Sequence, residues 1–158
     1  MRLARLAFAA ALFALPALPA HANIEEAVKA LQANDGAGAE KALQTLIAAR
    51  DPRAQFLLGL YVYGNAESKL FDVNKATPLL LDAAERGYTP AMIPIAGAFA
   101  EGKDVPKSFV EAYKWVAIAV HWNVPNAEQL LEQLVRDMKP DEIEKAKAEA
   151  KAYKFKTK

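Results

Sequence analysis

The feature that most constrains this chain is an internal repeat with a period of 36 to 37 residues. Small and apolar positions of one segment recur with similar chemistry 37 residues later. The first set is Ala54, Leu58, Gly59 and Val62, and the second is Ala91, Ile95, Ala96 and Phe99. Ala127, Leu131 and Val135 continue the series after a further 36 residues. A fixed period of this length is typical of arrays that stack one supersecondary unit many times.

The segments that precede these copies match one another as well. Ala76, Leu79 and Ala83 recur as Ala112, Trp115 and Ala119, each 36 residues later. Apolar residues recur at spacings of three and four, which indicates helices, so the repeating unit is a pair of helices. Small residues allow helices to approach closely. The residues predicted to pack the repeats are Ala54, Leu58, Gly59, Ala76, Ala83, Ala91, Ala96, Phe99, Ala112, Trp115 and Ala119.

Clusters of Gly, Pro and Asn separate the helical segments. The sequence predicts helices near 24–34, 39–50, 52–63, 74–86, 90–101, 107–121, 125–138 and 140–155. The predicted fold is therefore all-α: an α-solenoid of antiparallel helix pairs with repeat units of about 38–71, 72–107 and 108–138. The helix over 140–155 caps its C-terminal end.

The N-terminus is typical of a secretory signal peptide. Arg2 and Arg5 precede an unbroken apolar run over residues 6–20, which is shorter than the roughly 20 residues of a transmembrane helix. Ala20 and Ala22 form a small-x-small cleavage pattern. We expect cleavage after Ala22, export to the periplasm or beyond, and a mature domain over 23–158 without a transmembrane segment; the alternative is an uncleaved anchor.

Composition excludes several classes of function. The chain has 158 residues, 20 Lys and Arg against 19 Asp and Glu, and no cysteine. The near-neutral balance gives no electrostatic reason to expect nucleic-acid binding. The lack of cysteine excludes disulfides, thiolate zinc sites and a lipid-modified cysteine. We expect no metal and no cofactor.

The repeat resembles the Sel-one-like repeats, relatives of the tetratricopeptide repeat. The family pattern of Ala, Leu-Gly, an aromatic residue, a Gly turn, Val-Pro, Ala and Lys-Trp is echoed over most of the mature chain. The matching residues are Ala54, Leu58, Gly59, Tyr61, Gly64, Ala91, Phe99, Gly102, Val105, Pro106, Glu111, Ala112, Lys114, Trp115 and Ala119. The resemblance implies a helical solenoid that binds other proteins.

Four departures from the family pattern limit the comparison. Leu79 stands where an aromatic residue is common. Ser108 stands where the family usually has Asp. Pro78 and Pro94 fall inside expected helices, where proline removes a backbone hydrogen bond. We expect one helix to start late, near Asn74 or Thr77, and another to kink near Ile93.

Candidate chemistry is sparse, so we expect no enzyme activity. After cleavage the only histidine is His121 and the only serines are Ser68 and Ser108, which leaves little for a catalytic triad. Some exported, cysteine-rich members of the family are linked to penicillin binding or β-lactam hydrolysis. A cell-wall enzyme of that type is the alternative, although this chain lacks their cysteines.

Aromatic residues with polar tips are the candidates for partner binding, because such side chains are favoured at interfaces. They are Tyr63, Tyr88, Tyr113, His121 and Trp122. The C-terminal residues 151–158 carry four lysines and two aromatic residues, and a weak contact with an anionic membrane surface is a further possibility. The function expected is a periplasmic adaptor or regulator that binds an envelope protein or peptide; the remaining alternative is a passive stabilising subunit.

Overall fold

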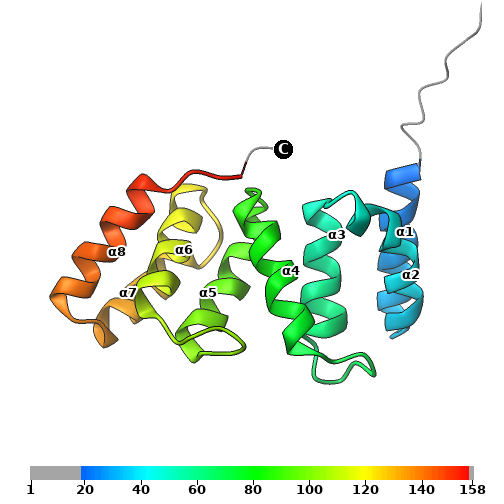
Figure 1. Ribbon diagram of the computed structural model, residues 1–158, viewed down its shortest axis with the longest axis horizontal. Helices are drawn as coiled ribbons and strands as arrows, with labels where there is room; N and C mark the ends of the chain where they lie inside the picture. The colour runs from blue at the N-terminus through cyan, green and yellow to red at the C-terminus, as the bar shows by residue number, and fades with distance from the viewer. Residues whose placement is uncertain (1–18, 157–158) are drawn as a thin grey trace, which may run out of the picture.

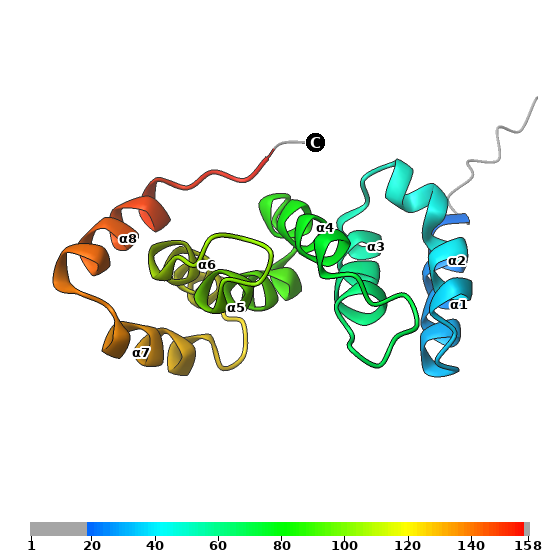
Figure 2. The ribbon, with the colours of Figure 1, turned by 60° about the horizontal axis from the view of Figure 1, so that its bottom comes forward.

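The computed structural model describes residues 19–156, and every regular element in this range is a helix (Figure 1). In chain order the elements are α1 (Pro19–Gln32), α2 (Gly36–Ala48), α3 (Pro52–Leu57), the π-helix η1 (Leu58–Tyr63), α4 (Val73–Glu85), the 3₁₀ turn η2 (Thr89–Ala91), α5 (Met92–Glu101), α6 (Phe109–His121), α7 (Ala127–Asp137) and α8 (Pro140–Ala152). The helices form one elongated row from α1 and α2 to α7 and α8 (Figures 1 and 2). The predicted all-α solenoid is confirmed.

The predicted signal peptide lies outside the described residues as far as position 18. The helix α1 begins at Pro19, so the expected cut after Ala22 falls in its first turn. Between residues 19 and 156, no helix has the length and apolar character needed to cross a bilayer.

Four helices begin at a side chain that accepts a hydrogen bond from the backbone of the first turn. The capping residues are Asp35, Asp51, Asp72 and Ser108. Ser108, which stands where the related repeats carry Asp, accepts a 3.2 Å bond from the amide of Glu111. The substitution therefore keeps the cap and the start of α6.

The segment expected as one helix over 52–63 changes to a π-helix at Leu58. A π-helix bonds each amide to the fifth preceding carbonyl and so turns less per residue than an α-helix. Leu58, Val62 and Tyr63 are consequently all buried. In an α-helix Tyr63 would lie farther from that face, so the local widening is what turns its ring into the core.

The two internal prolines are accommodated differently. The helix α4 starts at Val73, close to the late start expected from Pro78, and contains this proline at an exposed position. Before Pro94 the chain forms the 3₁₀ turn η2, and α5 begins only at Met92. Pro94 thus lies in the first turn of α5, where its missing amide breaks no helical bond. The irregularity expected near Ile93 is this junction between a 3₁₀ turn and an α-helix.

The core follows the repeat. Of the eleven residues predicted to pack the repeats, all except Phe99 are buried, and Phe99 is half-buried against the same core. Trp115 is the largest fully buried side chain. Gly59 lies against α4, close to Leu80 and the backbone of Ala76. Small residues therefore set the distance between neighbouring helices.

A buried carboxylate joins the first two helix pairs. Asp82 of α4 is only 8% exposed and accepts hydrogen bonds from Gln55 (2.6 Å), Arg50 (3.0 Å) and Arg86 (3.1 Å). Burial alone would raise the pKa of the Asp82 carboxyl. The hydrogen bonds from Gln55 and Arg86 outweigh this effect, so the pKa lies below its ordinary value.

The close approach at Gly59 predicts a steric cost. In Gly59→Ala the new Cβ would lie 3.0 Å from Leu80 Cγ and 3.1 Å from the Ala76 carbonyl oxygen. We expect the free energy of unfolding in urea to fall by about 1–3 kcal/mol. Gly97→Ala in α5 is the matched control, because its Cβ would meet no described atom within 4 Å. This control should gain up to about 1 kcal/mol from helix propensity; equal stability of the two variants would contradict the packing account.

The lowered pKa of Asp82 predicts a pH-dependent contribution. Its charged form stabilises the fold above the ordinary Asp pKa of about 4, and this contribution is lost as pH falls through the lower folded-state pKa. Asp82→Asn should lower the free energy of unfolding by about 1–3 kcal/mol at neutral pH and by less in acid. The exposed Asp104, which forms no ion pair with residues 19–156, supplies the control Asp104→Asn. A loss for Asp82→Asn that is the same at pH 7 and pH 3 would refute this role.

Candidate partner-binding site

The five side chains predicted as partner anchors lie in four separate places. Tyr63 is buried and donates a 2.6 Å hydrogen bond to Glu40, and the ammonium group of Lys75 lies 5.1 Å from the centre of its ring. Burial, followed by the bond to Glu40, raises the pKa of Tyr63 to about 12. The hydroxyl and ring of Tyr63 are therefore already engaged within the protein, beside a cavity that Tyr63 helps to line.

Tyr88 is half-buried and belongs to a local aromatic group. Its ring centre lies 5.3 Å from that of Phe56, which in turn contacts the exposed Tyr61 at 5.9 Å. Burial raises the pKa of the Tyr88 hydroxyl. Tyr88 thus closes the packing between α3 and the turn before α5.

His121 and Trp122 stand together at the C-terminal end of α6. Trp122 is 54% exposed, and its ring contacts both His121 and Phe155 of the C-terminal tail. These residues border a cavity of about 450 Å³ between α6 and the end of α8. The tail therefore packs on the protein rather than presenting Phe155 freely to a membrane.

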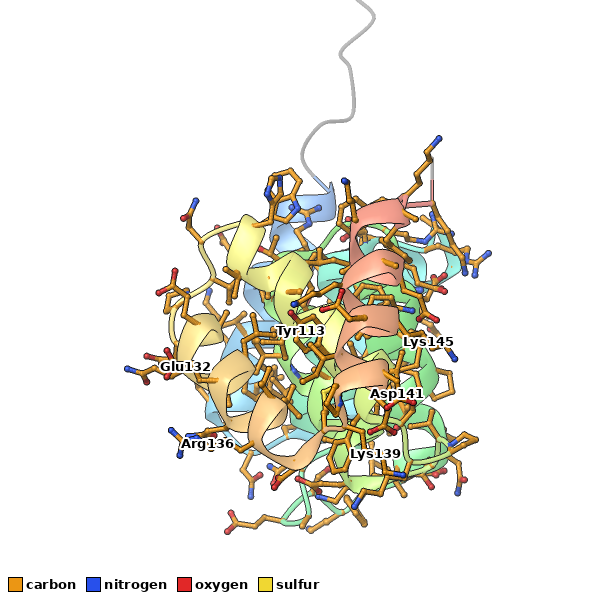
Figure 3. The ribbon with its side chains drawn as sticks, turned by 90° about the vertical axis from the view of Figure 1, so that its left-hand side faces the viewer. Tyr113, Glu132, Arg136, Lys139, Asp141 and Lys145 are labelled. Atoms are coloured by element: carbon orange, nitrogen blue, oxygen red, sulfur yellow. The ribbon has the colours of Figure 1, made fainter. Side chains whose placement is uncertain are left out.

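Tyr113 lies between α7 and α8 at the C-terminal end of the solenoid (Figure 3). It is only 6% exposed, yet it borders a hollow of about 550 Å³. We call this hollow the terminal groove; its lining residues are Tyr113, Glu128, Leu131, Glu132, Val135 and Arg136. Of the five predicted anchors, Tyr113 is the one that forms part of this groove.

The terminal groove exists because α7 has a close neighbour on one side only. The helix α5 packs against both α4 and α6, whereas α7 packs extensively only against α6. The helix α8 also packs on α6, and Tyr113 lies between α7 and α8 (Figure 3). The residues that line the groove come from α6 and α7. As a result, Ala127 is the one fully buried residue of α7, and Val135 is 37% exposed.

Charged side chains line the edges of the terminal groove. These lining charges are Glu128, Glu132 and Arg136 of α7. Lys139, Asp141 and Lys145 lie farther along the chain, at the start of α8 and in its first turns (Figure 3). Within residues 19–156, the three α7 charges form no ion pair with another side chain. An apolar strip flanked by charged side chains has the composition of a protein interface with a polar rim.

Comparisons with known proteins identify the fold. No family model matches the chain, and no curated protein matches it. A solved structure, that of a protective antigen of uropathogenic Escherichia coli displaying an SLR fold, is 18% identical with a TM-score of 0.74. The protein has the SLR fold. The match covers 83% of this chain and 29% of the antigen, so the chain spans under a third of that protein's length.

The SLR fold confirms the architecture implied by the sequence resemblance to Sel-one-like repeats. In this SLR-fold protein successive helices pack on one another through α7, whereas α8 packs mainly on α6; the terminal groove lies beside α7. Among the described residues, no group of three or more His, Asp or Glu side chains is arranged to hold a metal ion.

Two features of the structure are absent from the sequence prediction. The buried Asp82 looks in the sequence like any charge on a helix face, and its partners Arg50 and Gln55 are distant along the chain. The docked tail is the second: Tyr153 packs on Trp115 with ring centres 5.1 Å apart, and burial raises the pKa of Tyr153 to about 12. In the sequence, this tail is marked by the alternation of aromatic residues and lysines.

Proposed function

We propose that this SLR protein is an exported, non-enzymatic adaptor that binds a helix of another envelope protein in the terminal groove. The observation that carries the proposal is the uncovered side of α7, where Leu131 and Val135 lie beside Tyr113. When a partner covers exposed apolar side chains of this kind, their removal from water favours binding.

The shape of the groove favours a helix as its occupant. Its α7 wall is a single helical face formed by Glu128, Leu131, Glu132 and Val135, at spacings of three and four residues. From Glu128 to Arg136 this face extends about 12 Å along the axis, which is slightly more than two helical turns. Within the solenoid the corresponding side of α5 is covered by a helix, α6. A partner helix would continue that pattern of packing.

The charges indicate which helix would bind best. Its apolar stripe would contact Leu131, Val135 and the ring of Tyr113. Basic side chains on one flank would meet Glu128 and Glu132 at the N-terminal half of α7. An acidic side chain would meet Arg136 at the other end. Complementary charges of this kind mainly set orientation and association rate.

The positions of the candidate catalytic groups support a binding role over the β-lactam-related alternative. Ser108 caps the start of α6 and His121 ends the same helix. At 1.5 Å per residue they stand about 20 Å apart, too far for a hydroxyl and its base. The hydroxyl oxygen of Ser68 accepts a hydrogen bond from the amide of Leu70 in a surface loop.

Val135→Asp tests the groove directly. A carboxylate at this half-exposed position would oppose docking of an apolar helix without disturbing the buried core. With mature 23–158 as bait on periplasmic extract, we expect Val135→Asp to lose the stoichiometric partner at least tenfold, with an unchanged thermal melt. Phe71→Asp is the matched control, because Phe71 is 47% exposed in a loop away from the groove.

Equal recovery of the partner by the two variants would overturn the groove assignment. A wild-type chain that stays unfolded until its partner is added would instead favour a stabilising subunit. A folded wild-type chain that turns over a β-lactam probe would favour the enzyme alternative.

The proposal of export makes its own prediction. We expect the protein recovered from the periplasm to begin at Asn23, because Ala20 and Ala22 provide the small side chains that cleavage requires. Intact-mass measurement identifies the new terminus. Replacing Ala22 with a bulky residue should leave the leader attached and retain the chain at the membrane. A cytoplasmic chain that still begins at Met1 would contradict export.

A further inference from the structure

The C-terminal tail returns across the solenoid after α8 ends. Beyond Ala152 the chain becomes extended, with Tyr153 at φ −64° and ψ 138°. Residues 153–156 run from the end of α8 past α6 toward the C-terminal end of α4 (Figure 1). Four residues therefore connect the last helix to a helix two repeats away in the row.

The far end of the tail is held by α4. The backbone amide of Lys156 donates a 2.7 Å hydrogen bond to the carbonyl oxygen of Glu85, the last residue of that helix. Carbonyls in the last turn of a helix have no partner within the helix. The side chain of Lys156 also pairs with the Glu85 carboxylate and lies 4.0 Å from Asp82. This end of α4 thus recognises both the backbone and the charge of an extended peptide.

Two aromatic side chains of the tail occupy complementary surfaces. Tyr153 packs on Trp115, and Phe155 packs on Trp122 with ring centres 6.2 Å apart. The Phe155 ring also lies over Gly87, at 3.7 Å from where a Cβ would be. Gly87 has φ +81°, a conformation that favours glycine, and its lack of a side chain leaves room for the ring. Alternate side chains of the tail, Tyr153 and Phe155, are therefore bound by the protein surface, as in other complexes with extended peptides.

Part of the attachment of the docked tail is exposed to solvent. The Lys156 side chain is 52% exposed, and ion pairs of exposed groups contribute little. The backbone hydrogen bond to Glu85, the contacts of Tyr153 with Trp115 and Lys114, and the packing of Phe155 on Trp122 and Gly87 hold the rest of the segment. Trp115 beneath it is buried, and its indole N–H has no acceptor among residues 19–156. Among residues 19–156 the docked tail supplies no acceptor for this donor.

We propose that Glu85, Gly87, Trp115 and Trp122 form a binding site for extended peptides with the pattern aromatic-x-aromatic-Lys. We call it the tail site. In the free protein it is occupied in cis by residues 153–156, and a partner segment with the same pattern displaces them. The site is distinct from the terminal groove, and the inference does not depend on the function proposed for that groove.

Competition with the tail predicts how affinity responds to mutation. The apparent affinity of an added peptide is the intrinsic affinity multiplied by the fraction of molecules whose tail is undocked. A variant that loosens the tail without altering the tail site should therefore bind an added peptide more tightly. Lys156→Glu places a negative charge beside Glu85, and Phe155→Ala removes the ring over Gly87.

The test uses full-length mature protein and a fluorescein-labelled peptide with the sequence of residues 153–158. Fluorescence anisotropy should show roughly tenfold tighter binding by Lys156→Glu and Phe155→Ala than by the wild type. Lys154→Glu is the matched charge control, because Lys154 is exposed and makes no ion pair with the described residues, and its affinity should equal that of the wild type. A peptide with both aromatic residues replaced by alanine should not bind.

Two results would overturn the proposal: folded Lys156→Glu that binds the peptide no more tightly than wild type, or equal binding of the alanine-substituted peptide. Circular dichroism checks that each variant is folded. If Phe155→Ala is unstable, Lys156→Glu alone decides the test, because it changes an exposed side chain. Val135→Asp in the terminal groove should leave peptide affinity unchanged. Failure of the tail site is thereby distinguished from failure of the groove.

Discussion

The structure depends on the close approach of helices at small residues. Gly59 has the backbone of Ala76 and the side chain of Leu80 within contact distance of where a Cβ would be. Ala54, Ala91 and other small residues of the repeat are fully buried. One helix pair cannot bury its apolar face alone, so each pair is stabilised by the next. The same dependence leaves a problem at the ends, where the next pair is missing.

In the last repeat, one surface left without a following helix pair is covered and another is not. At one end of α6 the chain covers its own surface, because the extended tail packs Tyr153 on Trp115. At the side of α7 no such cover exists, and Val135 remains exposed next to a hollow. An occupied surface and an open surface thus lie on neighbouring parts of the same domain. Both are consequences of ending a solenoid, and both are suited to binding protein segments.

The periodicity of the sequence was sufficient to predict the helices and their packing, because the repeat places small residues at each contact. The sequence pattern could not predict the burial of Tyr63, because that burial depends on a π-helix from Leu58 to Tyr63. Nor could it predict Asp82, whose partners come from other helices. Tyr113 was identified as an aromatic candidate, but the groove that it borders is completed by side chains of α7. Local pattern predicts elements, whereas sites depend on contacts between distant residues.

The most direct measurement is photocross-linking in intact cells with a photoreactive amino acid incorporated at position 135, in the open side of α7. The account predicts a covalent adduct with one envelope protein from this position and none from position 71, which is more exposed but lies in the loop before α4. Cross-links from position 71 to the same protein, or none from position 135 while the protein is exported and folded, would contradict the claim that partners bind where the solenoid ends.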